Sequence, residues 1–216
     1  MTTRRLTPFD RVLSELEHAL RTSTGGGVRA AARKSPADTL PKDEALDESQ
    51  RQEAARLMRV NHAGEIAAQA LYQGQAFMAW DPKVQEAMAK SSEEEVDHLA
   101  WCEQRIQELG GSVSKLDPLW YAGSFAIGAL AGVVGDAQSL GFVGETERQV
   151  VEHLEKHLQK LPEADTRSRA ILTQMRDDEA RHGAAAERAG GAAMPAPVRG
   201  IMRIMSKVMT GTAYWI

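Results

Sequence analysis

Two Glu-x-x-His triplets, at residues 95–98 and 179–182, lie within long segments of helical periodicity. Positions i and i+3 share one helix face, so each triplet presents a carboxylate and an imidazole to the same point. A single glutamate precedes each triplet, with 30 residues from Glu65 to Glu95 and 32 from Glu147 to Glu179. This repeat predicts two helical hairpins whose inner faces meet at the centre of one bundle.

The helical patterns cover residues 47–80, 83–109, 118–160 and 165–189. Between them stand Pro- and Gly-containing pairs that typically end helices. We find no alternating pattern of the kind that predicts strands. A chain of 216 residues is long enough to bury one core. The predicted fold is therefore all-α, a four-helix bundle over residues 47–216.

The first 46 residues differ from this body. Residues 7–21 have apolar side chains at helical spacing and predict a short amphipathic helix. Residues 22–42 are rich in glycine, proline and basic side chains, which is typical of a mobile linker. A third Glu-x-x-His triplet, at residues 15–18, falls in this N-terminal helix, and we interpret His18 as a solvated side chain.

The acidic members of the repeat share helix faces with apolar residues. Glu147, for example, lies on the same stripe as Val143 and Leu154. Burying an unpaired carboxylate costs several kcal/mol or more. An ion pair with a buried arginine, or partial exposure, would explain one such glutamate. Four inward glutamates with two inward histidines favour a metal centre instead. The six predicted metal ligands are Glu65, Glu95, His98, Glu147, Glu179 and His182.

The ligand types indicate which metals fit. Four carboxylates with two imidazoles suit a pair of iron or manganese ions, and the sequence alone does not separate the two. Glu95 and Glu179 are the predicted bridging ligands, because each is tethered to a histidine. The only cysteine, Cys102, excludes an intrachain disulfide and indicates a reducing compartment. A net charge of -4 gives no reason to expect a nucleic-acid partner.

Residues 59–65, with the sequence RVNHAGE, begin a resemblance to the demethoxyubiquinone hydroxylases. It continues through both triplets and extends over about residues 48–216. The resemblance implies a ferritin-like fold that hydroxylates a polyprenylated benzoquinol, 3-demethoxyubiquinol, with O2 late in ubiquinone biosynthesis. It also implies two iron ions, Fe2+ in the reduced state, and an external reductant such as NADH or the quinol. His153 matches a family histidine that lies just behind the ligands, although a surface histidine is the open alternative.

A substrate with a long isoprenoid tail implies contact with a membrane. Residues 118–135 contain no charge until Asp136, and they fit either a helix packed in the protein or at its surface, which we favour, or a marginal membrane span. Residues 198–216 form a basic, Met-rich amphipathic pattern that suits a membrane interface or a docking helix completing the core. We expect a peripheral protein on the cytoplasmic face of the bacterial cell membrane, whose partners include accessory lipid-binding proteins and a second copy of the chain.

Other functions fit the same ligand set. A di-metal peroxidase or ferroxidase would use these residues, as would an iron-storage bundle that assembles into shells. The apolar segments 118–135 and 198–216 argue for an enzyme with a lipid substrate, because a storage protein has no need of them.

Overall fold

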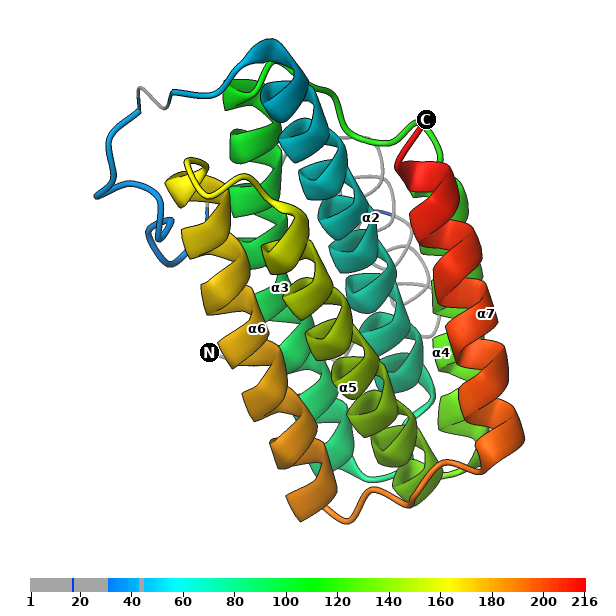
Figure 1. Cartoon of the computed structure of the whole chain (residues 1–216). Coiled ribbons are helices and arrows are strands. Elements are labelled where there is room, and N and C mark those ends of the chain that lie inside the picture. The colour runs from blue at the N-terminus through cyan, green and yellow to red at the C-terminus, as the bar shows by residue number, and fades with distance from the viewer. Residues whose placement is uncertain (1–16, 18–30, 43–44) are drawn as a thin grey trace.

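The computed structural model describes residue 17, residues 31–42 and residues 45–216, and within them the regular secondary structure is all helix, with no strand. Six helices lie within these described residues (Figure 1). They are α2 (Glu48–Met78), α3 (Pro82–Glu108), α4 (Asp117–Val134), α5 (Asp136–Lys160), α6 (Thr166–Arg188) and α7 (Ala196–Ala213). The all-α prediction is confirmed. The predicted N-terminal helix and the first part of the linker lie outside the described residues, apart from Glu17.

Helices α2, α3, α5 and α6 form the bundle, and three of them start at an aspartate. Asp47 and Gln50 form a reciprocal capping box at the start of α2. Asp81 caps α3 by accepting a hydrogen bond from the Lys83 amide. Asp165 does the same for α6 through the Ser168 amide. These caps fix the start of each helix, and thereby the height at which its functional residues lie in the bundle.

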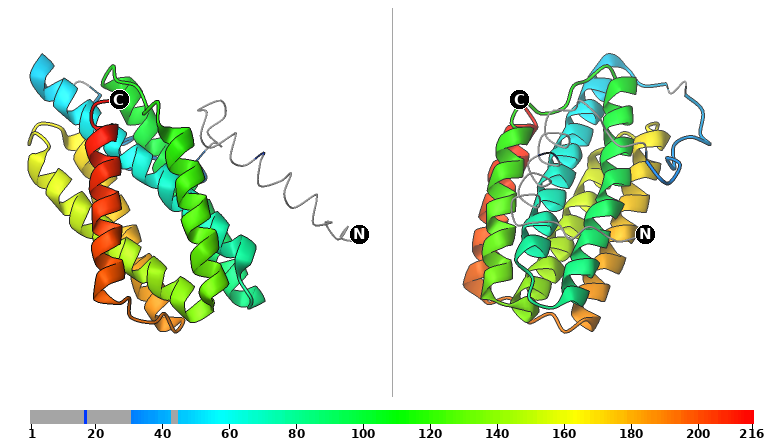
Figure 2. Two further views of the ribbon diagram at one scale, coloured as in Figure 1. Left: turned by 90° about the vertical axis from the view of Figure 1, so that its right-hand side faces the viewer. Right: turned by 180° about the vertical axis from the view of Figure 1, so that it is seen from behind.

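The prediction of one continuous helix over residues 118–160 is wrong. The chain breaks at Gly135, whose φ of 130° lies in a region that only glycine adopts without strain. As a result α5 belongs to the bundle, whereas α4 packs outside it against α2 (Figures 1 and 2). No proline separates the uncharged sequence of α4 from the periodic sequence of α5. The helical pattern therefore gave no sign of the break at Gly135.

Glycines set the close approach of α4 to α2. A Cβ atom added at Gly128 would lie 2.1 Å from the Leu71 carbonyl oxygen, and one added at Gly74 would lie 2.2 Å from that of Phe125. The opposite face of α4 is exposed, including Leu130 and Val134. The favoured prediction for residues 118–135, a helix packed in the protein or at its surface, is therefore confirmed. None of the described helices combines the length and the hydropathy that crossing a membrane requires.

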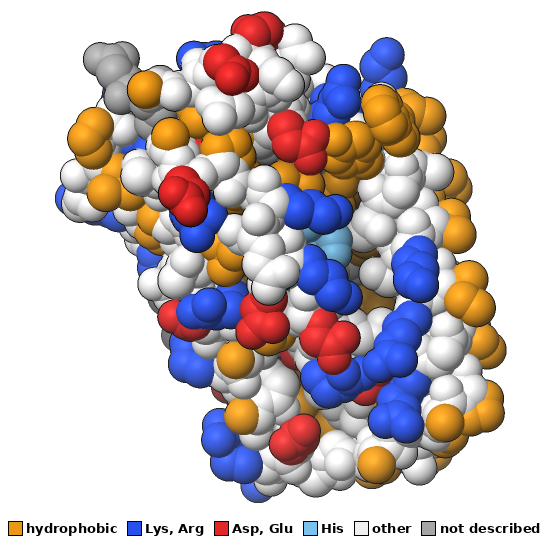
Figure 3. Space-filling view, viewed as in Figure 1, with side chains coloured by type: hydrophobic (Ala, Val, Ile, Leu, Met, Phe, Trp, Pro, Cys, Tyr) orange, Lys and Arg blue, Asp and Glu red, His pale blue; other side chains and the backbone are white. Residues whose placement is uncertain are grey.

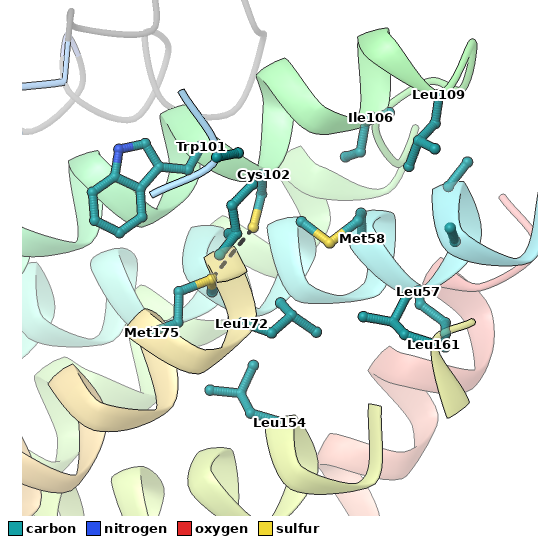
Figure 4. Close-up of a cluster of buried hydrophobic side chains, with 14 of the residues drawn as sticks. Leu57, Met58, Trp101, Cys102, Ile106, Leu109, Leu154, Leu161, Leu172 and Met175 are labelled. Atoms are coloured by element: carbon teal, nitrogen blue, oxygen red, sulfur yellow. Dashed lines mark hydrogen bonds between the residues drawn. The ribbon is translucent and has the colours of Figure 1, made fainter. Parts of the chain in front are cut away.

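The largest apolar cluster lies at one end of the bundle, between α2, α3, α5 and α6 (Figure 4). Cys102 of α3 and Met175 of α6 meet there with their sulfur atoms 3.7 Å apart. Cys102 is fully buried and belongs to this packing. The cluster joins the two helical hairpins, and the polar centre described below lies beside it, because His98 is one helical turn from Cys102.

Residues 31–42, which we call the strap, precede α2 and contact α3 and α6. This segment falls within the predicted linker, yet Ala37 is 1% exposed and lies in the main apolar cluster. The backbone carbonyl oxygens of Ala37 and Leu40 accept hydrogen bonds from Arg167 of α6. The composition of the strap resembles that of a linker, because its attachment depends on backbone carbonyls and on single side chains rather than on an apolar stripe.

Candidate metal centre

The six predicted ligands come from four helices and are all buried. Glu65 lies on α2, Glu147 on α5, and the two triplets on α3 and α6. Their nitrogen and oxygen atoms form two groups, each with all members within 4.8 Å of one another. Both groups contain Glu95 and Glu179, the two residues predicted to bridge. The first group is Glu65, Glu95, His98 and Glu179, and the second is Glu95, Glu147, Glu179 and His182.

The Nδ1 atoms of both histidines point into the centre. His98 Nδ1 lies 3.4 Å from Glu65 Oε2, 3.1 Å from Glu95 Oε2 and 3.0 Å from Glu179 Oε1. His182 Nδ1 lies 3.2 Å from Glu179 Oε2 and 3.5 Å from Glu95 Oε1. Each imidazole thus faces both shared glutamates through one nitrogen and leaves the other nitrogen free to face outward.

The four glutamates fit a cation rather than a set of internal hydrogen bonds. Each has one buried carboxylate oxygen without a hydrogen-bond partner among the described residues. Buried polar atoms in folded proteins are nearly always paired, and each exception needs an explanation. In the four glutamates these atoms are Glu65 Oε2, Glu95 Oε1, Glu147 Oε1 and Glu179 Oε1, and buried atoms of this kind also occur outside the centre, for example Asp117 Oδ1. Carboxylate oxygens with imidazole nitrogens are a ligand set for iron or manganese.

The electrostatics of the centre also favour bound cations. Burial and the neighbouring Glu95 carboxylate raise the pKa of Glu65 well above its ordinary value. Burial and the Glu179 carboxylate do the same for Glu147. Burial acts to lower the pKa of His182, but the adjacent Glu179 and Glu95 carboxylates outweigh it and raise that pKa to about 12. Without metal, therefore, protons supply the positive charge that these carboxylates require. Divalent cations would displace those protons on binding.

Two acidic residues behind the histidines were missed by the sequence analysis. His98 Nε2 lies 3.0 Å from Asp178 Oδ2, and His182 Nε2 lies 2.7 Å from Glu94 Oε2. Such partners fix the tautomer and the orientation of a metal-binding imidazole. The arrangement is reciprocal, since Asp178 and Glu94 each stand immediately before the glutamate of the opposite triplet. The sequence signal that could have revealed them is the acidic residue directly before the glutamate in both triplets, Glu94 before Glu95 and Asp178 before Glu179.

His153 lies on α5, 3.9 Å from His157 between ring centroids. His157 Nδ1 in turn lies 3.0 Å from Asn61 Oδ1. Among the described contacts of His153, none reaches a member of the two groups. Its Nε2 is buried without a hydrogen-bond partner in the described part of the chain. A role for His153 behind the ligands stays a prediction.

Comparison with known proteins adds a family to this geometry. Residues 52–213 match the family described as "Ubiquinone biosynthesis protein COQ7". A protein of Alcanivorax borkumensis named 3-demethoxyubiquinol 3-hydroxylase is 56% identical over 219 residues, covering 100% of both chains. Proteins of the same name from Bordetella petrii and Ralstonia pickettii are 54% and 55% identical, covering 99% and 96% of this chain and 94% and 100% of their own.

Proposed function

The chain belongs to the family of the ubiquinone biosynthesis protein COQ7, and from this premise we propose that it is a 3-demethoxyubiquinol 3-hydroxylase with two bound iron ions. The observation that carries the proposal is the pair of buried ligand groups that share Glu95 and Glu179. The relatives' shared name supports the substrate and the ring position.

The proposed ligands are the six residues predicted from the sequence. His98 and Glu65 would hold one ion, His182 and Glu147 the other, and Glu95 and Glu179 would contact both. When bound, two ferrous ions supply a site for the two-electron reduction of O2. The protein holds its ligands in place through helix packing and through Asp178 and Glu94. The burial of all six residues keeps bulk water from the reacting oxygen.

The overall reaction needs an external reductant. One atom of O2 enters the ring C–H bond and the other leaves as water, which consumes two electrons beyond those of the C–H bond. We propose NADH, or the quinol itself, as their source. Glu95 and Glu179 each have both oxygens directed at the centre, so each carboxylate would be able to bind one ion or both.

The substrate is a lipid, and we propose that α4 and α7 bring the enzyme to it. Both helices expose large apolar side chains. Figure 3 has hydrophobic side chains along the edge of the molecule formed by these helices, with Lys and Arg side chains beside them. The exposed apolar residues on the two helices are Leu119, Leu130, Val133, Val134, Ile201, Ile204, Met205 and Val208. An apolar strip flanked by cations suits the surface of an anionic bilayer. We propose peripheral attachment at the cytoplasmic face of the bacterial cell membrane.

The proposal is tested by following oxygen into the product. Protein reconstituted anaerobically with Fe(II) is given 3-demethoxyubiquinol in vesicles, isotope-labelled O2 and a reductant. We expect one labelled oxygen atom in the quinol ring, and none with Glu179→Gln. The matched control is Glu187→Gln, an exposed glutamate on the same helix, which keeps the activity. Oxygen consumption and iron oxidation with an unchanged quinol would indicate a ferroxidase and contradict the proposal.

A further inference from the structure

The strap lies across α3 and α6, the two helices that contain the triplets (Figure 1). It is attached there at two points. At its far end, Arg167 of α6 donates to the carbonyl oxygens of Ala37 and Leu40 at 2.6 and 3.0 Å. The same guanidinium donates to Glu108 of α3. Because Arg167 is 1% exposed, this contact fixes the strap against both helices.

The near end of the strap is fixed by Arg33. Its Nε donates to Asp97 Oδ2 on α3 at 2.7 Å, and its Nη1 donates to Asp178 Oδ2 on α6 at 2.8 Å. The guanidinium lies over the ring of Trp101, 4.8 Å from its centroid. The Ala32 amide adds a 2.7 Å hydrogen bond to Asp97 Oδ1. One side chain of the strap therefore ties together the two helices that carry the histidines.

Asp178 connects Arg33 to the metal centre. The same oxygen, Oδ2, receives Arg33 Nη1 at 2.8 Å and lies 3.0 Å from His98 Nε2. His98 then points Nδ1 at its group of glutamates. The corresponding residue behind His182 is less enclosed, because the Glu94 side chain is 34% exposed and that of Asp178 is 0% exposed. Arg33 is thus connected through Asp178 to the half of the centre that contains His98.

We infer that Arg33 is a positioning residue that fixes α3 against α6 and holds Asp178 so that His98 is aimed at the Glu65–Glu95–Glu179 group. This inference rests on the proposed metal site. It assigns a role to a segment outside the family match, which begins at residue 52. The alignment with the Alcanivorax borkumensis relative covers the whole chain, strap included.

The test measures metal binding instead of turnover. Co(II) is titrated anaerobically into the full chain, and the visible spectrum and the affinity of each equivalent are recorded. The variant is Arg33→Met, which keeps an apolar stem over Trp101 but removes the guanidinium. The matched control is Lys34→Met at the exposed neighbouring position. We expect two Co(II) ions in the wild type and in the control. In Arg33→Met one of the two should bind about tenfold more weakly, which is the lower end of the effect of losing a direct partner of a ligand, because Arg33 acts through Asp178.

Asp178→Asn decides whether Arg33 acts through Asp178. In that background we expect Arg33→Met to change the Co(II) affinity by less than half of its effect in the wild type. An equal effect in both backgrounds would overturn the inference, as would wild-type affinity in a folded Arg33→Met protein. Arg33→Gln replaces Arg33→Met if circular dichroism finds the latter unfolded. A wild-type protein that fails to bind two ions would instead overturn the proposed function, and the inference with it.

Discussion

At the scale of single residues, the two histidines are oriented by acidic side chains that do not touch the centre. Glu94 accepts from His182 Nε2, so that His182 Nδ1 faces Glu179 and Glu95. We predict that Glu94→Gln weakens binding of one metal ion by about tenfold or more, because the anionic partner of the imidazole is lost. A titration with Fe(II) or Co(II) measures this. Glu93→Gln, at the exposed neighbouring position, is the control, and equal affinities for the two variants would contradict the prediction.

The paired histidines of α5 give the fold a dependence on pH. Burial, with Lys156 and Lys160 nearby, lowers the pKa of His153 from 6.5 to about 4. The unfolded chain therefore takes up a proton between these pH values while the folded chain does not. Stability from the neutral imidazole is complete above about pH 6.5 and is lost as the pH falls toward 4.

Urea unfolding of the metal-free protein at about pH 7.5 and about pH 5 tests this. We predict that the wild type loses about 1–2 kcal/mol more than His153→Asn between the two conditions, since one pKa unit corresponds to about 1.4 kcal/mol. The comparison with the variant removes the contribution of the carboxylates. Identical losses in the two proteins would show that folding does not lower the pKa of His153.

Residue spacing, together with the apolar stripes on which these residues lie, was sufficient to predict that the six side chains meet inside the bundle. Both features can be recognised within a single helix. They were not sufficient for Asp178, Glu94 or Arg33. Their roles depend on which residue of one helix stands opposite which residue of another, and the register between helices is set by packing. Arg33 in particular lies 145 positions from Asp178, in a segment whose composition resembles a linker.

At the scale of elements, α2, α3 and α6 begin and end within two residues of the predicted helical patterns 47–80, 83–109 and 165–189. The exception is the join between α4 and α5, where a single glycine with positive φ separates two helices. Isolated glycines are common inside helical patterns, so nothing local distinguished Gly135 from Gly123. The difference lies in the tertiary structure, since α5 must enter the bundle while α4 lies outside it against α2 (Figure 2).

Alanine substitutions at two glycines of α4 are predicted to change the free energy of unfolding in opposite directions. Gly128→Ala places a Cβ atom 2.1 Å from the Leu71 carbonyl oxygen, and the two helices must separate. We expect a loss of about 1–3 kcal/mol in the free energy of unfolding, as for other overpacked sites. Gly123 has nothing within 4 Å, so Gly123→Ala should add up to about 1 kcal/mol through helix propensity. Thermal and urea unfolding measure both. Destabilisation of equal size at the two positions would contradict close packing as the cause.

At the scale of the whole molecule, the strap and α7 lie on opposite sides of the bundle (Figure 1). One side fixes the two helices with the histidines, and the other exposes the apolar residues of α4 and α7. Ile204 and Val208 are 64% and 56% exposed on one face of α7. This division separates the side of the protein where the strap contacts α3 and α6 from the side that we propose meets the lipid.

Attachment to lipid is predicted to depend on α7. The double variant Ile204→Glu with Val208→Glu should bind anionic vesicles at least about tenfold more weakly, because burying each side chain contributes about 1.5–3 kcal/mol. Thr173→Glu with Ala180→Glu adds the same charge to exposed positions of α6 and should bind as the wild type does. Vesicle co-sedimentation measures both. Equal weakening would mean that net charge, and not the apolar face, governs binding.

We propose that six side chains from four helices hold two iron ions. Mössbauer spectroscopy of protein reconstituted anaerobically with isotopically enriched Fe(II), combined with the iron content per chain, measures this directly. We predict two high-spin ferrous ions per chain in the wild type and a loss of both in Glu95→Ala with Glu179→Ala, which removes the shared ligands. One iron per chain or none in the folded wild type, or two irons retained by the double variant, would contradict the proposed di-iron centre.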